Sequence, residues 1–209
     1  MYSAVLWDFG GVILTSPFEA FARYEGDNGL PDGFLRGVNA TNPDANAWAR
    51  LERNELTPDE FDVAFADESH ALGHRVPGRD VLARLMGDVR PEMVEALDAV
   101  RSAGYKTACL TNNVVSDDPR PDIDVVMSRF DVVVESSKIG VRKPEPRFYQ
   151  TACELLGVEP SSCVFLDDLG INLKPAKAMG MATIKVVDPA TALAELAALI
   201  DLPLTSSTN

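Results

Sequence analysis

Short apolar runs alternate with helix-like segments along most of this chain. The runs are rich in Val, Ile and Leu and cover residues 3–8, 105–110, 131–135, 162–167 and 182–187. Continuous apolar runs of this kind are typical of strands that are buried on both faces of a parallel sheet. Two of the intervening segments, residues 90–104 and 143–157, have apolar residues at helical spacing, a proline near the start and a glycine at the end. Strands that alternate with helices predict right-handed crossovers and a doubly wound parallel sheet, an α/β fold.

Residues 16–88 interrupt this alternation, because they contain helical patterns but no strand-like run. The best-marked helix lies in residues 56–72. There Thr57 is the expected N-cap, Pro58 the first helical residue and Glu60 the partner in a capping box. A helical block directly after the first strand predicts a small lid over the carboxyl edge of the sheet.

We therefore predict two structural parts and a short tail. Residues 1–15 and 89–204 form the α/β core, and residues 16–88 form an all-helical cap inserted after the first strand. Residues 205–209 are polar, and we expect them to be flexible.

The composition is that of an acidic globular protein. The 209 residues are 46% apolar and 24% charged, with a formal net charge of −13. This charge argues against nucleic acid or an anionic membrane as a partner, because a phosphate backbone requires a basic surface. A small anionic substrate is compatible with it, provided that a metal or a few local cations offset the field. The longest apolar runs fall short of the roughly 20 residues that cross a bilayer.

The three cysteines, Cys109, Cys153 and Cys163, all lie in apolar stretches. An odd number of cysteines in such places is typical of buried, reduced thiols. The chain enters its first strand-like run without a charged leader, so we expect no secretory signal. We therefore expect a cytoplasmic protein, and its oligomeric state, monomer or homodimer, stays open.

Polar residues follow the predicted strands at their carboxyl ends. They are Asp8 after the first strand, Thr111 and Asn112 after the second, Asp167 and Asp168 after the fourth, and Lys143 at the helix beyond the third. In an open parallel sheet the carboxyl ends of the strands border one crevice, so we expect these groups to converge.

These residue types favour phosphoryl-transfer chemistry. Two or three carboxylates at one edge repel one another unless a hard cation joins them. Mg²⁺ fits best, because it takes oxygen ligands and keeps waters that a phosphate can displace. Thr111 and Asn112 can donate hydrogen bonds to phosphate oxygens, and Lys143 offers a point charge for the same anion. Asp8, at the end of a rigid strand, can act as a nucleophile and form an aspartyl-phosphate.

At these residues the chain resembles the haloacid dehalogenase-like (HAD) superfamily of phosphohydrolases. Four stretches match the four motifs of this superfamily in order, namely VLWDFGGVIL (5–14), ACLTNN (108–113), VRKPEPRFY (141–149) and VFLDDLGINLKPAKAMGM (164–181). The resemblance is narrower to the phosphatase-type N-terminal domain of soluble epoxide hydrolase and to the matching domain of acyl-CoA dehydrogenase family member 10. It implies a Rossmann-like three-layer core, a helical cap and a small phosphorylated metabolite as substrate.

The resemblance also implies a role for each residue. Asp8 is the nucleophile, Lys143 bridges the nucleophile and the phosphate, and Asn172 supports the metal loop. Thr111 and Asn112 hold the phosphoryl group. The implied magnesium ligands are Asp8, the backbone carbonyl of Gly10, Asp168 directly, and Asp167 either directly or through water.

Gly10 departs from the pattern of the superfamily, which has a second aspartate at this position. The backbone carbonyl of that aspartate binds the metal, and its side chain acts as general acid and base. Glycine keeps the carbonyl but removes the proton donor, and losing a general acid–base typically costs about 10²–10⁴-fold in rate. Leaving groups that depart without protonation, such as anomeric or acyl phosphates, can still be released.

Two other functions stay open at this point. The first is a catalytically degenerate HAD module that binds phosphate or a partner, which Gly10 permits. The second is a haloacid dehalogenase, which also lacks the second aspartate. A dehalogenase needs no metal, however, so the pair Asp167–Asp168 argues against it. Arg142, directly before Lys143, is either an additional positive charge for the site or a solvated side chain.

Overall fold

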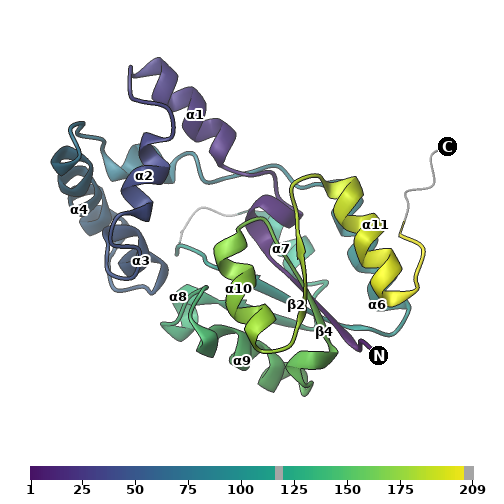
Figure 1. The fold of residues 1–209 in the computed structure, drawn as a ribbon. Coiled ribbons are helices and arrows are strands. Elements are labelled where there is room, and N and C mark those ends of the chain that lie inside the picture. The colour runs from purple at the N-terminus through teal and green to yellow at the C-terminus, as the bar shows by residue number, and fades with distance from the viewer. Residues whose placement is uncertain (116–119, 205–209) are drawn as a thin grey trace.

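A five-stranded parallel sheet forms the centre of the computed structural model, which describes residues 1–115 and 120–204 (Figure 1). The strands are β1 (Ala4–Trp7), β2 (Lys106–Thr111), β3 (Val132–Glu135), β4 (Cys163–Asp167) and β5 (Ala182–Lys185). Their order is β3-β2-β1-β4-β5, with every neighbouring pair parallel. Each strand lies in one of the five predicted runs or is displaced from it by a single residue, so the predicted doubly wound sheet is confirmed.

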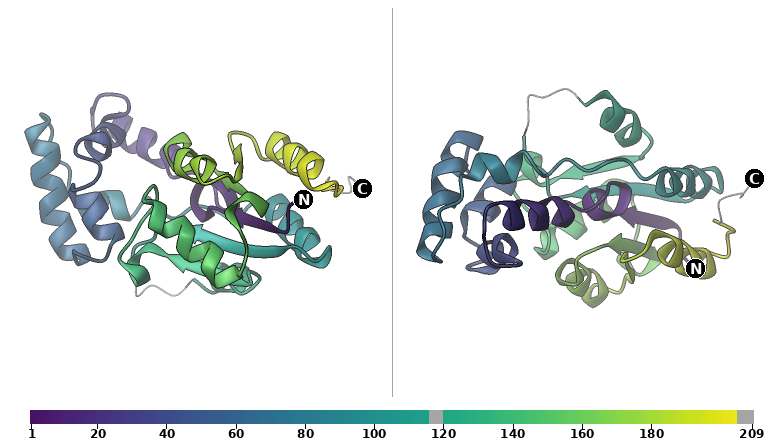
Figure 2. Two further views of the ribbon diagram at one scale, coloured as in Figure 1. Left: turned by 60° about the horizontal axis from the view of Figure 1, so that its bottom comes forward. Right: turned by 90° about the horizontal axis from the view of Figure 1, so that it is seen from above.

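Helices cover both faces of the sheet and complete the three layers (Figure 2). On one face lie α6 (Pro91–Ser102), α7 (Pro121–Met127) and α11 (Pro189–Ile200), and on the other lie α9 (Pro146–Leu156) and α10 (Gly170–Ala178). Along β1 the side chains alternate between these layers, with Val5 and Trp7 in the first cluster and Ala4 and Leu6 in the second. Burial on both faces explains why the strands read as continuous apolar runs.

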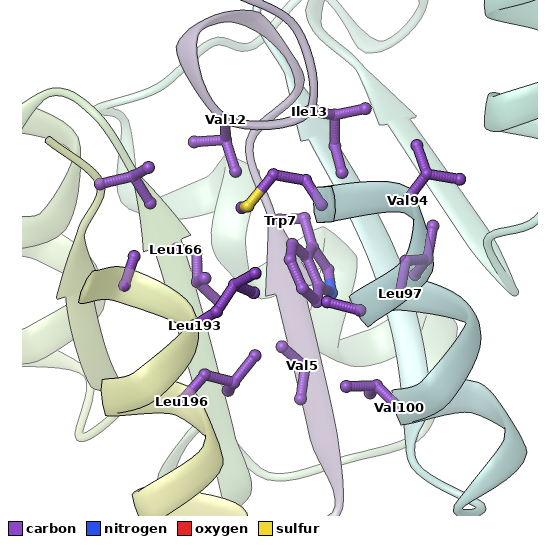
Figure 3. Close-up of a cluster of buried hydrophobic side chains, with 14 of the residues drawn as sticks. Val5, Trp7, Val12, Ile13, Val94, Leu97, Val100, Leu166, Leu193 and Leu196 are labelled. Atoms are coloured by element: carbon purple, nitrogen blue, oxygen red, sulfur yellow. The ribbon is translucent and has the colours of Figure 1, made fainter. Parts of the chain in front are cut away.

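Trp7 lies at the centre of the first hydrophobic cluster (Figure 3). Its side chain is fully buried near Leu97 of α6 and Leu193 of α11. Trp7 precedes Asp8, and the alternation of side chains along an extended strand sends the two to opposite faces. Trp7 therefore anchors β1 in the core while Asp8 is left for the edge of the sheet.

After a short π-helical turn (Phe9–Ile13), five α-helices come between β1 and α6 and form a separate group beside the carboxyl end of the sheet (Figures 1 and 2). They are α1 (Phe18–Asp27), α2 (Phe34–Ala40), α3 (Ala47–Glu52), α4 (Pro58–Ala71) and α5 (Gly78–Leu82). They share their own hydrophobic cluster, centred on Leu35, Phe61 and Phe65. The expected capping box of α4 is present, because Thr57 and Glu60 each accept from the other's backbone N–H.

These helices lie inside the predicted cap of residues 16–88, and the domain boundaries themselves stay a prediction. The expected flexible tail, residues 205–209, lies outside the described residues. Within the described ranges, none of the helices is long and apolar enough to cross a membrane. Cys109, Cys153 and Cys163 are free and buried, as predicted.

Candidate active site

The carboxyl ends of β1 and β4 bring Asp8 and Asp167 to the ammonium group of Lys143. Nζ of Lys143 lies 2.7 Å from Oδ1 of Asp8 and 2.8 Å from Oδ2 of Asp167. The backbone N–H of Asp8 still donates to the carbonyl of Leu166 on β4, at 2.8 Å. The N–H of Phe9 donates to Oδ1 of Asp8 at 2.6 Å. The carboxylate of Asp8 is therefore fixed at its backbone and at one oxygen, directly beside a buried cation.

Asp167 is bonded to the protein through both of its carboxylate oxygens. Oδ1 accepts from the N–H of Leu169 at 2.8 Å and from Nδ2 of Asn172 at 3.0 Å. Oδ2 accepts from Lys143 and from the same Asn172 amide, at 2.8 and 3.1 Å. The hydroxyl of Tyr149 in turn donates to the carbonyl of Asn172 at 2.7 Å. Asp167, fully buried, thus anchors Lys143 and shapes the turn that leads into α10.

Asp168 packs against the backbone of the loop that follows β1. A Cβ atom at Gly11 would lie 2.3 Å from Oδ2 of Asp168, and Gly11 has a φ of +77°. Only glycine tolerates both this close approach and this positive φ without strain, because it has no Cβ and adopts positive φ freely. The carbonyl of Gly11 accepts from Nη1 of Arg90 at 3.1 Å. The loop is thus held close enough for Asp168 to face Asp8.

The carboxylates of Asp8, Asp167 and Asp168 each offer an oxygen within 4.8 Å of the others. Burial, followed by the charge of Asp167, raises the pKa of Asp8 well above its ordinary value. The same two causes raise the pKa of Asp168 to about 6. Burial alone would lower the pKa of Lys143, but the charges of Asp167 and Asp8 outweigh it and raise that pKa. The cluster therefore holds three carboxylates but one ammonium, which contacts two of them. The excess negative charge and the all-oxygen donor set fit a hard divalent cation.

Thr111 and Asn112 lie at the carboxyl end of β2, which is the strand next to β1. Thr111 is buried. Nδ2 of Asn112 donates to the carbonyl of Lys143 at 3.0 Å, and its Oδ1 accepts from the N–H of Lys143 at 2.8 Å. The same Nδ2 donates to Oε2 of Glu52 at 3.1 Å. The side chain of Asn112 is therefore committed to protein groups, and it holds the backbone of Lys143 on both sides.

Gly10 lies open to solvent at the start of the loop that follows β1. Its φ of −68° and ψ of 132° are accessible to any L-residue. A Cβ atom built at Gly10 meets no heavy atom within 4 Å in the described structure. The backbone and the surroundings thus have room for the side chain that the superfamily pattern places here.

Of two further residues near this site, Glu52 was not assigned a role from the sequence, and two alternatives stayed open for Arg142. Glu52 ends α3 in the helical group, yet its carboxylate reaches Asn112 of the core. Arg142 is neither solvated nor free for substrate, because its guanidinium pairs with Glu52 and its side chain is 13% exposed. A lone glutamate at the end of a helix carries no sequence signal, and 60 residues separate it from Asn112.

Comparison with known proteins identifies relatives over nearly the whole chain. The sequence profile of haloacid dehalogenase-like hydrolases matches residues 2–180. Acyl-CoA dehydrogenase family member 10 of Mus musculus is 36% identical over 208 residues, which cover 97% of this chain and 20% of the relative. Bifunctional epoxide hydrolase 2 of the same species is 33% identical over 206 residues, covering 91% and 37%. The chain therefore spans only part of the length of these two relatives.

A third relative has nearly the same length as this chain. Phosphatase MT3486 of Mycobacterium tuberculosis is 38% identical over 197 residues, which cover 86% of this chain and 84% of the relative. Solved structures share the fold. A HAD family enzyme of Bacteroides thetaiotaomicron, in complex with magnesium and inorganic phosphate, has a TM-score of 0.59 at 21% identity, covering 88% of this chain and 94% of that one. A dehalogenase has a TM-score of 0.62 at 20% identity, covering 95% and 96%.

Proposed function

This chain belongs to the haloacid dehalogenase-like hydrolase family, and we propose that it is a magnesium-dependent phosphatase that acts on a small phosphorylated metabolite. The observation that carries the proposal is the contact of Asp8 with buried Lys143, beside the carboxylate of Asp168. A relative of similar length that is named a phosphatase supports it. The adjacent acids Asp167 and Asp168 also favour a phosphatase over a dehalogenase. Paired acids suit a metal site, and attack on carbon by a dehalogenase requires no metal.

The metal would be held by Asp8, by the backbone carbonyl of Gly10 and by Asp168. When bound, Mg²⁺ supplies positive charge that offsets the carboxylates and polarises the phosphoryl oxygens. Asp167 has a different task, because both of its oxygens already accept hydrogen bonds from Lys143, Leu169 and Asn172. It fixes the position of the lysine and of the loop that carries Asp168.

Asp8 acts as the nucleophile. Its carboxylate oxygen Oδ2 forms a bond to phosphorus, while Oδ1 stays with Lys143 and the N–H of Phe9. The bond between phosphorus and the leaving oxygen breaks, and that oxygen keeps the electron pair. Lys143 and the hydroxyl of Thr111 contact the phosphoryl oxygens, whose charge must be stabilised during transfer.

A water molecule then attacks the phosphorus of the aspartyl-phosphate. The bond from phosphorus to Asp8 breaks, the carboxylate is regenerated, and inorganic phosphate leaves. The proton that the leaving oxygen takes up comes from solvent, because Gly10 has no side chain to deliver it. We therefore expect efficient phosphoryl transfer to Asp8 only from leaving groups that depart without protonation, such as those of anomeric and acyl phosphates.

The experiment is hydrolysis of p-nitrophenyl phosphate, and of a panel of sugar-1-phosphates and acyl phosphates, by the purified protein with Mg²⁺ or with EDTA. We expect activity that requires Mg²⁺ and that is lost in Asp8→Asn without loss of the folded state. Asp32→Asn, at an exposed aspartate between α1 and α2, is the matched control. Retained activity in Asp8→Asn would contradict the assignment of the nucleophile.

The intermediate can be tested separately by intact-mass measurement after rapid quenching. Hydrolysis of the aspartyl-phosphate also requires a base, and Gly10 provides none. We therefore expect a phosphate adduct to accumulate on the wild-type protein during turnover and to be missing from Asp8→Asn.

A second candidate function follows from the same glycine. A catalytically degenerate module would bind phosphate or a partner at this site without turnover. Isothermal titration with inorganic phosphate and Mg²⁺, alongside the substrate panel, separates the two functions. Binding without hydrolysis of any phosphate in the panel would favour the degenerate module.

The remaining proposals concern the surroundings of the protein. The net charge of −13 supports a small-molecule partner rather than nucleic acid or a membrane. The free, buried cysteines support a reducing, cytoplasmic compartment.

A further inference from the structure

Glu52 of α3 is a buried carboxylate that reaches from the helical group into the edge of the site. Its side chain is 7% exposed. Oε1 accepts from Nε1 of Trp48 at 2.9 Å, and Oε2 accepts both from Nε of Arg142 and from Nδ2 of Asn112, the latter at 3.1 Å. Three donors thus converge on one carboxylate, and two of them come from the α/β core.

The contacts of Asn112 extend this chain of hydrogen bonds to Lys143. Asn112 donates to the carbonyl of Lys143 at 3.0 Å and accepts from its N–H at 2.8 Å. The side chain of the same lysine ends 2.7 Å from Asp8. The position of the ammonium depends on the backbone from which it extends, and Asn112 fixes that backbone. Glu52 in turn fixes the amide of Asn112.

The same region joins the helical group to the core at further points. Nη1 of Arg142 donates to the carbonyl of Pro43 at 3.1 Å. Nη1 of Arg53 lies 3.6 Å from Oε1 of Glu145. Figure 1 shows α3 lying beside α8 (Ser136–Ile139), at the carboxyl end of the sheet. Glu52 contacts Asn112 directly. The ion pair between Arg53 and Glu145 involves neither Asn112 nor Lys143.

Stability alone does not account for this arrangement. Burial is the main cause of a raised pKa for Glu52, which means that its charged form is costly in this place. A buried ion pair often contributes no more to stability than apolar residues of the same volume would. The carboxylate does supply a fixed acceptor for Asn112, which an apolar residue would not.

We propose that Glu52 is a positioning residue for phosphoryl transfer, which couples the seating of α3 on the core to the placement of Lys143 through Asn112. The proposal rests on the proposed phosphatase function for its kinetic consequence. The hydrogen-bond chain itself can be tested without activity.

The kinetic test compares Glu52→Ala with Arg53→Gln, a control at the C-cap of α3 that removes the ion pair with Glu145 of the core, together with the contacts of Arg53 to Glu55 and to the Asp44 carbonyl. We expect kcat on p-nitrophenyl phosphate with Mg²⁺ to fall by up to about 10²-fold in Glu52→Ala, the scale at which a misplaced group affects rate. KM should change much less, and Arg53→Gln should keep the wild-type kcat. Glu52→Gln retains an oxygen acceptor for Asn112 and should recover part of the loss.

A double-mutant cycle tests the route through Asn112. If Glu52 acts through this amide, Glu52→Ala combined with Asn112→Ala should have the same kcat as Asn112→Ala alone. If the fold-losses in kcat of the two single variants multiply in the double variant, Glu52 acts independently of Asn112. That result would overturn the proposal.

Hydrogen–deuterium exchange at the backbone N–H of Lys143 provides a readout that does not depend on catalysis. This N–H donates to Asn112, so we expect faster exchange in Glu52→Ala and an unchanged rate in Arg53→Gln. If Glu52→Ala does not fold, the nearly isosteric Glu52→Gln takes its place, with a smaller increase expected. Exchange and kcat at wild-type levels, with only a lowered melting temperature, would overturn the proposal. A wild-type protein without hydrolytic activity would instead contradict the proposed function, and exchange would still decide the role of Glu52.

Discussion

Nζ of Lys143 lies 2.7 Å from Oδ1 of Asp8, and the lysine side chain is 1% exposed. The pair joins a residue directly after β1 to one that lies beyond β3, and it holds the proposed nucleophile in place before any substrate binds. A buried ammonium with two carboxylate neighbours also offsets part of the negative charge that the carboxyl end of the sheet collects.

Removing this ammonium should destabilise the protein. Lys143→Met leaves Asp8 and Asp167 buried without their cation, and breaking a buried pair in this way costs about 3–5 kcal/mol. Urea unfolding in EDTA measures the loss, and added Mg²⁺ should recover part of it by supplying the missing positive charge. Lys174→Met, at an exposed lysine of α10, is the control and should change the free energy of unfolding by less than about 0.5 kcal/mol. Equal effects of the two variants would contradict the assigned role of the buried lysine.

Gly10→Asp should restore a proton donor to the site. The backbone of Gly10 accepts an L-residue, and a Cβ atom there meets no described heavy atom within 4 Å. We expect kcat/KM to rise for alkyl phosphates, toward the roughly 10²–10⁴-fold that a general acid contributes, and to rise much less for p-nitrophenyl phosphate. Gly10→Asn fills the same space without a titratable proton and should show no such preference. An equal increase on both substrates would contradict the missing-acid explanation.

Gly11→Ala should be far more damaging than Gly10→Ala, although the two glycines are adjacent. A Cβ atom at Gly11 would lie 2.3 Å from Oδ2 of Asp168, and the φ of +77° strains any residue other than glycine. We therefore expect Gly11→Ala to lower the free energy of unfolding by more than about 1 kcal/mol and to displace Asp168 from the proposed metal site. Denaturant unfolding and isothermal titration with Mg²⁺ check the two effects. Similar values for both alanine variants would show that the loop adapts to the added methyl group.

The hydroxyl of Tyr24 should make the stability of the helical group sensitive to alkaline pH. This hydroxyl donates to Oδ2 of Asp80 at 2.8 Å, which joins α1 to α5. Burial first, and then Asp80, raises the pKa of Tyr24 to about 12. The pKa of this hydroxyl is thus higher in the folded state than its ordinary value of about 10 in the unfolded chain. The neutral phenol therefore contributes its full stabilisation below about pH 10, and this contribution is lost as the pH rises toward 12.

Urea unfolding of the wild type and of Tyr24→Phe across this pH range tests the expectation. The difference in free energy of unfolding between them should be constant below about pH 10 and should then decrease. Burial also raises the pKa of Tyr149, so ultraviolet titration should compare the two proteins, and a phenolate transition near pH 12 should be present in the wild type and missing from Tyr24→Phe. A difference that stays constant up to pH 12 would contradict the contribution of the hydrogen bond to Asp80.

The sequence by itself determined the sheet, most of its boundaries and the place where the polar groups gather. These features depend on local patterns, because a strand buried on both faces must be apolar along its length. The carboxyl ends of such strands must then carry the chemistry. The polar residues at these ends could therefore be located by counting along the apolar runs and the helix beyond the third run, namely Asp8, Thr111, Asn112, Lys143, Asp167 and Asp168. The superfamily motifs added their roles and the supporting residue Asn172.

Only the tertiary structure decided how these residues divide their tasks. It shows that both oxygens of Asp167 are bonded to protein groups, that the side chain of Asn112 holds Lys143, and that Arg142 is paired with Glu52. The contacts of Glu52 with Asn112 and with Arg142 span 60 and 90 residues of sequence. No local periodicity encodes such a pairing, because it arises when the helical group packs against the carboxyl end of the sheet.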